Sequence, residues 1–119
     1  MPDIRPTVLV LDDDPLTLEL YSRELSVDCR VITSNDVQHA RQLLLEQKPD
    51  LLVIEPAINC DEGWLLLHEL QAAKNPPLVI LCSVQDERIA GMGQGASAYL
   101  VKPVLPDTLH FYVEDQSRA

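Results

Sequence analysis

The chain has 119 residues, of which 46% are hydrophobic, and its 19 acidic and 9 basic side chains give a net charge of −10. This length suits one domain with a single core. The negative charge opposes contact with nucleic acid phosphates, so we expect no direct nucleic acid binding and a partner surface that is apolar or basic. Because no apolar run approaches the ~20 residues of a membrane span and no signal peptide is visible, we expect no membrane association.

The cysteines are odd in number, and neither they nor the histidines show the spacing typical of metal ligands. We expect ordinary thiols in a reducing cytoplasm and histidines on the surface. These residues are Cys29, Cys60, Cys82, His39, His68 and His110.

Short apolar runs alternate with amphipathic stretches along the whole chain. Five runs predict buried strands, at residues 7–11, 30–33, 51–54, 78–81 and 98–101.

Helices are predicted between these strands from their caps and stops. Asp14 is a candidate N-cap with Pro15 at the first helical position, and Leu16, Leu20 and Leu25 form the expected apolar face. The second helix begins after Asn35 or Asp36 and ends before Pro49. The third covers residues 63–74 and the last covers 106–115, while glycines at 91, 93 and 95 are expected to fray a helix between strands four and five.

Alternating strands and helices predict parallel pairing through right-handed crossovers, with helices on both faces of the sheet. We expect an α/β, doubly wound, five-stranded sheet of order 2-1-3-4-5, the flavodoxin-like three-layer sandwich. This topology places a ligand beside the carboxyl ends of strands one and three.

Polar side chains follow four of the predicted strands. Because the carboxyl ends of parallel strands share one edge, we expect these side chains to converge in a single cleft. They are Asp12 and Asp13 after strand one, Glu55 after strand three, Cys82 and Ser83 after strand four, and Lys102 after strand five.

Four segments together resemble the receiver domain of response regulators, a CheY-like domain, and the resemblance covers essentially the whole chain. We therefore expect residues 1–119 to form one receiver-like domain, which a longer regulator could carry as its N-terminal module. The segments are Val10–Pro15, Pro49–Gly63, Gly95-Ala96 and Tyr99–Pro103.

The resemblance implies roles for individual residues. In the family, the positions of Asp12 and Asp13 hold Mg²⁺, and an aspartate at the position of Glu55 accepts a phosphoryl group. A threonine or serine at the position of Cys82 contacts the phosphoryl oxygens, and the lysine pairs with them. Tyr99 falls at an aromatic position that changes rotamer on activation, and the Lys102-Pro103 peptide is expected to be cis.

Two positions depart from that pattern. Glu55 moves its carboxylate outward by about one C–C bond, ~1.5 Å, and a displacement of this size can cost ~10²-fold in rate. Its charge then lies where it can pair with Lys102. Cys82 replaces a hydroxyl with a weakly donating thiol, and strand alternation directs Ser83 to the other face. Two alternatives remain for balancing the acidic cluster: a weakly bound Mg²⁺, or Lys102 alone.

The preferred interpretation is a non-enzymatic module of a two-component phosphorelay that is not phosphorylated and acts by protein–protein contact. An output domain or a second copy would bind the face formed by helix four, strand five and helix five, which the resemblance implies. One alternative is a receiver that is phosphorylated through unusual acceptor chemistry. The other is a small flavodoxin-like nucleotide-binding enzyme, although the chain lacks a phosphate loop.

Overall fold

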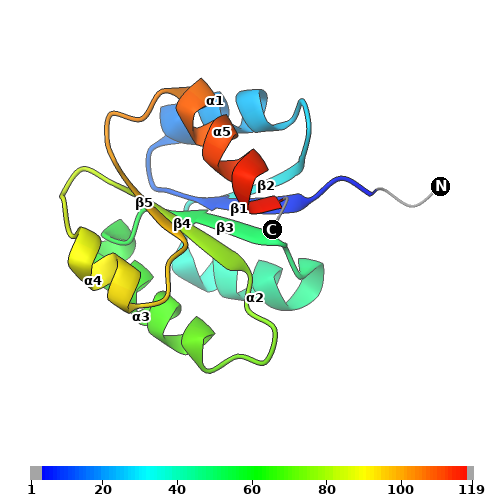
Figure 1. Cartoon of the computed structure of the whole chain (residues 1–119). Coiled ribbons are helices and arrows are strands. Elements are labelled where there is room, and N and C mark those ends of the chain that lie inside the picture. Colours follow the sequence, from blue (N-terminus) through cyan, green and yellow to red (C-terminus); the bar gives the residue numbers. More distant parts are fainter. Residues whose placement is uncertain (1–3, 118–119) are drawn as a thin grey trace.

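The computed structural model describes residues 4–117, which form one parallel sheet between two layers of helices (Figure 1). The strand order is β2-β1-β3-β4-β5, as predicted, and every neighbouring pair is parallel. The strands are β1 (Thr7–Leu11), β2 (Arg30–Ser34), β3 (Leu51–Ile54), β4 (Leu78–Ser83) and β5 (Ala98–Val101).

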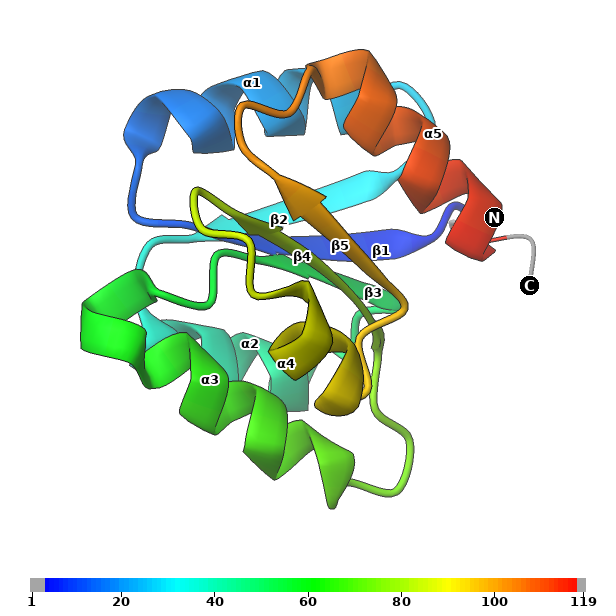
Figure 2. The same cartoon turned by 60° about the vertical axis from the view of Figure 1, so that its left-hand side comes forward.

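Five helices cover the two faces of the sheet. Helices α1 and α5 lie on one face, and α2, α3 and α4 lie on the other (Figures 1 and 2). The helices are α1 (Pro15–Leu25), α2 (Val37–Gln47), α3 (Ile58–Gln71), α4 (Arg88–Gly93) and α5 (Pro106–Ser117). Within residues 4–117, none of them is long and apolar enough to cross a bilayer.

The alternation of side chains along each strand divides the core into two clusters. On β1, Val8 and Val10 pack with residues of α1 and α5, whereas Leu9 and Leu11 pack with residues of α2 and α3. Because both faces are covered, the strands are apolar at consecutive positions, which explains the uninterrupted apolar runs in the sequence.

The predicted caps of the first two helices are present. The carboxylate of Asp14 accepts hydrogen bonds from the Leu16 N–H at 3.3 Å and from the Thr17 hydroxyl at 2.6 Å, and Pro15 occupies the first helical position. Asp36 rather than Asn35 caps α2, accepting from the His39 N–H at 3.0 Å. Helix α2 ends in a left-handed residue, Lys48, directly before Pro49.

Helix α3 differs from its prediction at both ends. It ends at Gln71, three residues earlier than predicted, and its first turn contains Asn59, Cys60 and Asp61 at φ of 53°, 56° and 69°. Left-handed backbone costs roughly 1–2 kcal/mol per non-glycine residue, so other contacts must hold this turn in place. One is the Asn59 side-chain oxygen, which accepts from the Val37 N–H at 2.9 Å and ties the turn to α2.

The predicted apolar face of α1 is only partly correct. Leu25 is buried, but Leu16 is 60% exposed and Leu20 is also exposed. Tyr21 takes their expected place in the core between α1 and the sheet. The remaining boundary differences are small: β2 extends by one residue, β4 by two and α5 by two relative to prediction.

Candidate functional site

Three adjacent strands bring the polar residues together at the carboxyl edge of the sheet. Leu11 pairs with Ile54, and Ile54 pairs with Leu81, so the residues that follow them lie side by side. Those residues are Asp12, Glu55 and Cys82. Lys102 follows β5, and its backbone N–H donates to the carbonyl of Ser83 at 2.7 Å, which brings the lysine beside them.

The ammonium of Lys102 bridges two buried carboxylates. Its Nζ lies 2.7 Å from Asp12 Oδ2 and 3.3 Å from Glu55 Oε1. Asp12 is only 2% exposed and Glu55 only 6%. The expected contact between Glu55 and Lys102 is therefore present, but the shorter contact of the lysine is to Asp12.

The second oxygen of each carboxylate has a backbone partner. Asp12 Oδ1 accepts from the Asp14 N–H at 2.9 Å, and Glu55 Oε2 accepts from the Ala57 N–H at 3.3 Å. Buried carboxylates require such partners because an unpaired charge out of water is costly. Both acidic side chains are thus held by a combination of the lysine and the loops that follow β1 and β3.

The pKa values of Asp12 and Lys102 are set by two opposing effects, burial and the pairing of opposite charges. Burial raises the pKa of Asp12 above its ordinary value, although its hydrogen bond with Lys102 acts in the opposite direction. For Lys102, burial acts to lower the pKa, but the hydrogen bond to Asp12 and the charges of Asp12 and Glu55 outweigh it and raise the pKa. The lysine is therefore held in its charged form by the two carboxylates.

The donor set at this edge is of the type that Mg²⁺ prefers, since carboxylate oxygens are hard ligands. The Lys102 ammonium lies against Asp12 Oδ2 and Glu55 Oε1, so an ion that used these oxygens would have to displace it. Asp13 is exposed, and within residues 4–117 it makes no hydrogen bond or ion pair. It lies next to Asp12 in the chain but does not join the bridge.

Cys82 and Ser83 point to opposite faces of the sheet, as strand alternation predicts. Cys82 packs in the cluster of Val10, Val53 and Ile80, and burial raises the pKa of its thiol to about 12. The Ser83 hydroxyl instead accepts from the Gln85 N–H at 3.3 Å. The side chain that β4 directs toward Asp12, Glu55 and Lys102 is therefore an un-ionised thiol and not a hydroxyl.

Tyr99 is buried against α4 and bonded to the loop that follows β4. Its hydroxyl donates to the Gln85 carbonyl at 2.6 Å and accepts from the Glu87 N–H at 3.0 Å. Gly91 makes room for the ring, because a Cβ at this position would lie 2.6 Å from Tyr99 Cδ2 and 2.5 Å from Leu81 Cδ1. Gly91 was expected to fray the helix; instead it permits close packing on Tyr99.

The Lys102-Pro103 peptide is cis, as the resemblance implied. Pro103 itself is exposed and lines a hollow of about 400 Å³ with residues of α1, including Leu20 and Tyr21.

Comparison with known proteins identifies the family. Residues 8–114 match the response regulator receiver domain, and the chain belongs to this family.

Relatives and solved structures agree with this assignment. The chain is 34% identical over 102 residues to the probable transcriptional regulatory protein TcrX of Mycobacterium tuberculosis, covering 82% of this chain and 43% of that protein. The receiver domain of the Francisella response regulator 1452 superimposes with a TM-score of 0.88 at 26% identity, covering 96% of this chain and 98% of that one. The BeF3-activated DrrB receiver domain also has a TM-score of 0.88, at 21% identity over 98% of this chain and all of the other, which supports the fold alone.

The chain spans less than half the length of the curated relatives that it matches.

Receiver domains in general bind Mg²⁺ at their phosphorylation site.

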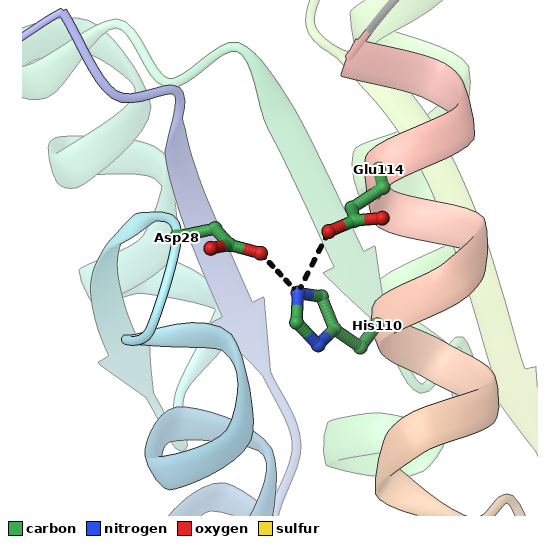
Figure 3. A group of neighbouring side chains, drawn as sticks. All are labelled: Asp28, His110 and Glu114. Carbon is green, nitrogen blue, oxygen red and sulfur yellow. Dashed lines mark hydrogen bonds and ion pairs between the residues drawn. The ribbon is translucent and has the colours of Figure 1, made fainter.

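One group of neighbouring polar residues was not predicted from the sequence. His110 was expected on the surface, but its side chain is only 20% exposed and lies between Asp28 and Glu114 (Figure 3). The spacing of His110 and Glu114, four residues apart on one helix, could have indicated this pair. Nothing in the sequence places Asp28 beside them, because it belongs to the loop between α1 and β2.

Proposed function

We propose that this receiver domain is not phosphorylated and that it signals as a non-enzymatic module through protein–protein contact. It would act in a two-component pathway in the cytoplasm, where its three free thiols stay reduced. The observation that carries the proposal is the bridge from Lys102 to Asp12 and to Glu55, the glutamate at the acceptor position.

The chemistry of Glu55 supports this proposal. Phosphoryl transfer to a carboxylate depends on positioning and on neutralising the charge that is transferred. At this edge, Glu55 is one methylene longer than the aspartate of the family, and Lys102 is already bound to Asp12. The neighbouring side chain from β4 is the buried Cys82. We infer that Mg²⁺ binds only weakly, because it must displace the ammonium from Asp12.

The likeness to the family suggests which face meets a partner, and the side chains of α4 and α5 support it. Ile89 on α4 is 93% exposed and Phe111 on α5 is 65% exposed. The edge strand β5 lies between these helices (Figure 2), and a hollow over it is lined by residues that include Met92 and Tyr112. Exposed apolar side chains of this size are characteristic of interaction surfaces. We propose that a second copy or an output domain binds here, and that any DNA contact is made by the output domain.

The test is association measured with and without a phosphoryl donor. Sedimentation of the full chain, alone and with its partner once identified, is compared before and after addition of Mg²⁺ and acetyl phosphate. We expect the same degree of association in both conditions, because a donor that cannot react does not favour either conformation. The double variant Glu55→Asp/Cys82→Thr restores the family's side chains and should make association depend on the donor.

Two surface variants locate the contact. Ile89→Asp should weaken association, whereas Leu45→Asp, an equally polar change at an exposed leucine of α2, should leave it unchanged. Association of the unaltered protein that rises with acetyl phosphate would contradict the proposal. Equal effects of the two substitutions would exclude the α4–β5–α5 face as the contact.

A further inference from the structure

A mixed histidine and carboxylate cluster lies at the opposite edge of the sheet from Asp12 and Glu55. His110 and Glu114 project from α5, and Asp28 projects from the loop that precedes β2 (Figure 3). Their ligand atoms all lie within 4.8 Å of one another. The family's phosphorylation chemistry does not use this end of the sheet, and the cluster therefore needs a separate explanation.

Two carboxylates contact the same nitrogen of His110. His110 Nε2 is 2.5 Å from Asp28 Oδ2 and 3.3 Å from Glu114 Oε1. Ligands of a tetrahedral Zn²⁺, each about 2.0–2.2 Å from the metal, lie roughly 3.4 Å apart. Small rotations of the two carboxylates would therefore suffice to bring all three atoms into a coordination shell.

The other imidazole nitrogen has its own carboxylate. His110 Nδ1 lies 3.4 Å from Glu24 Oε2. A carboxylate beside the far nitrogen orients a metal-binding histidine. The nearer nitrogen, Nε2, contacts Asp28 and Glu114 in the metal-free protein, so an ion that binds there replaces any proton it carries, and that proton is released to solvent. Glu24 belongs to α1, so the arrangement joins α1, the loop after it and α5.

The surroundings favour positive charge at this point. Three carboxylates, those of Asp28, Glu114 and Glu24, each lie within 3.4 Å of a ring nitrogen of His110. The cluster also follows the C-terminal end of α1, where the helix dipole attracts cations. Asp28 and Glu114 are partly exposed, so an ion could enter from solvent and keep a water ligand.

We propose that Asp28, His110 and Glu114 form a binding site for a divalent transition metal such as Zn²⁺, with Glu24 orienting the imidazole. The imidazole nitrogen selects this class over Mg²⁺ and Ca²⁺, which prefer oxygen ligands alone. The bound ion would link α5 to the loop between α1 and β2. This site is independent of whether Glu55 is phosphorylated.

The experiment is a calorimetric titration of the full chain with zinc chloride, in a Cys60→Ser background that removes the exposed thiol. We expect one ion per chain, an increased melting temperature on binding, and no displacement by excess Mg²⁺. Glu114→Gln and His110→Asn should each lower the affinity by more than ~100-fold, and Glu24→Gln by about 10-fold, in the range of outer-shell substitutions. His68→Asn, at an exposed histidine of α3, is the matched control and should bind as before.

Four outcomes would overturn the proposal. They are the absence of zinc binding, binding that survives both His110→Asn and Glu114→Gln, binding that is lost on Cys29→Ser but not on Glu114→Gln, and equal affinity for Mg²⁺. Glu114 is partly exposed and glutamine matches its shape, so Glu114→Gln tests the site even if His110→Asn disturbs the packing of α5. Circular dichroism of each variant verifies its fold.

Discussion

At the carboxyl edge of the sheet, a single ammonium group bridges two buried carboxylates. Lys102 reaches Asp12 and Glu55 from the end of β5, and each carboxylate has one further backbone partner. If one member of a buried ion pair is removed, the other is left buried without a counter-charge. The free-energy cost of that loss is larger than the net stabilisation that the intact pair provides. The stability of the domain and the state of the site are therefore linked through this lysine.

We expect Lys102→Met to lower the free energy of unfolding by about 3 kcal/mol, because Asp12 and Glu55 would then be buried without a counter-ion. Urea denaturation measures the change. The matched control is Lys74→Met at an exposed lysine, which should change stability by less than about 0.5 kcal/mol. Mg²⁺ should restore part of the loss in Lys102→Met but have little effect on the unaltered chain. Equal stability of the two variants would show that the bridge is not stabilising.

The three thiols should differ sharply in reactivity. Cys60 is exposed, whereas Cys29 and Cys82 are buried, and burial raises the pKa of Cys82 to about 12. Because the thiolate is the reactive form, Cys82 stays protonated and inert below that pH. Iodoacetamide at mildly alkaline pH should label one thiol in the folded protein and three in urea. Rapid labelling of Cys82 in the folded chain would mean that the carboxyl edge opens readily.

The residues of the bridge were predictable because each follows a strand in a parallel sheet, where topology alone brings strand ends together. The partner choice of Lys102 was not, since it depends on the side-chain conformations of Asp12 and Glu55. His110 was misjudged for a related reason. Its partner Asp28 comes from a loop whose position follows from packing of α1 against α5, which no local pattern in the sequence reveals.

Helix α4 shows how an element can be adapted to one buried side chain. It has only six residues, and Gly91 faces the ring of Tyr99 with no space for a Cβ. Gly93, in the same helix, has no atom within 4 Å of the position of a Cβ. Two glycines in one short helix therefore have different roles, and the difference is testable.

We expect Gly91→Ala to destabilise the domain by about 1–3 kcal/mol through overpacking against Leu81 and Tyr99. It should also displace the Tyr99 ring and break the hydrogen bond of its hydroxyl with Gln85, which the ring resonances of Tyr99 in NMR spectra would show. Gly93→Ala is the matched control and should be neutral or stabilising by up to about 1 kcal/mol, since it only restricts the unfolded chain. The proposal for Gly91 is wrong if both alanines behave alike.

Element type was easier to predict than element boundaries. All five strands were placed correctly because a sheet covered on both faces requires consecutive apolar residues. The apolar face of α1 was partly wrong, because Leu16 lies exposed near the carboxyl edge while Tyr21 fills the core. The start of α3 was unpredictable from composition, since Asn59, Cys60 and Asp61 adopt left-handed backbone, and Asn59 is tied to α2 by a long-range hydrogen bond.

At the scale of the whole molecule, the two edges of the sheet have different chemistry. At the carboxyl edge, Lys102 bridges the carboxylates of Asp12 and Glu55. At the opposite edge, the proposed metal site lies between α1 and α5. The exposed apolar side chains of α4 and α5 are a third feature. Because the chain has a net charge of −10, a partner that binds there should not itself be strongly acidic. For the carboxyl edge, we propose that Glu55 occupies the acceptor position without accepting a phosphoryl group.

The most direct test is intact mass spectrometry of the unaltered chain after incubation with acetyl phosphate and Mg²⁺. We predict no added phosphoryl group, because the Glu55 carboxylate is displaced, Lys102 is bound to Asp12, and Cys82 offers no hydroxyl. The variant Glu55→Asp/Cys82→Thr, treated in parallel, should gain one phosphoryl group and shows that the donor is active. A gain of one phosphoryl group by the unaltered chain that disappears in Glu55→Gln would contradict the claim.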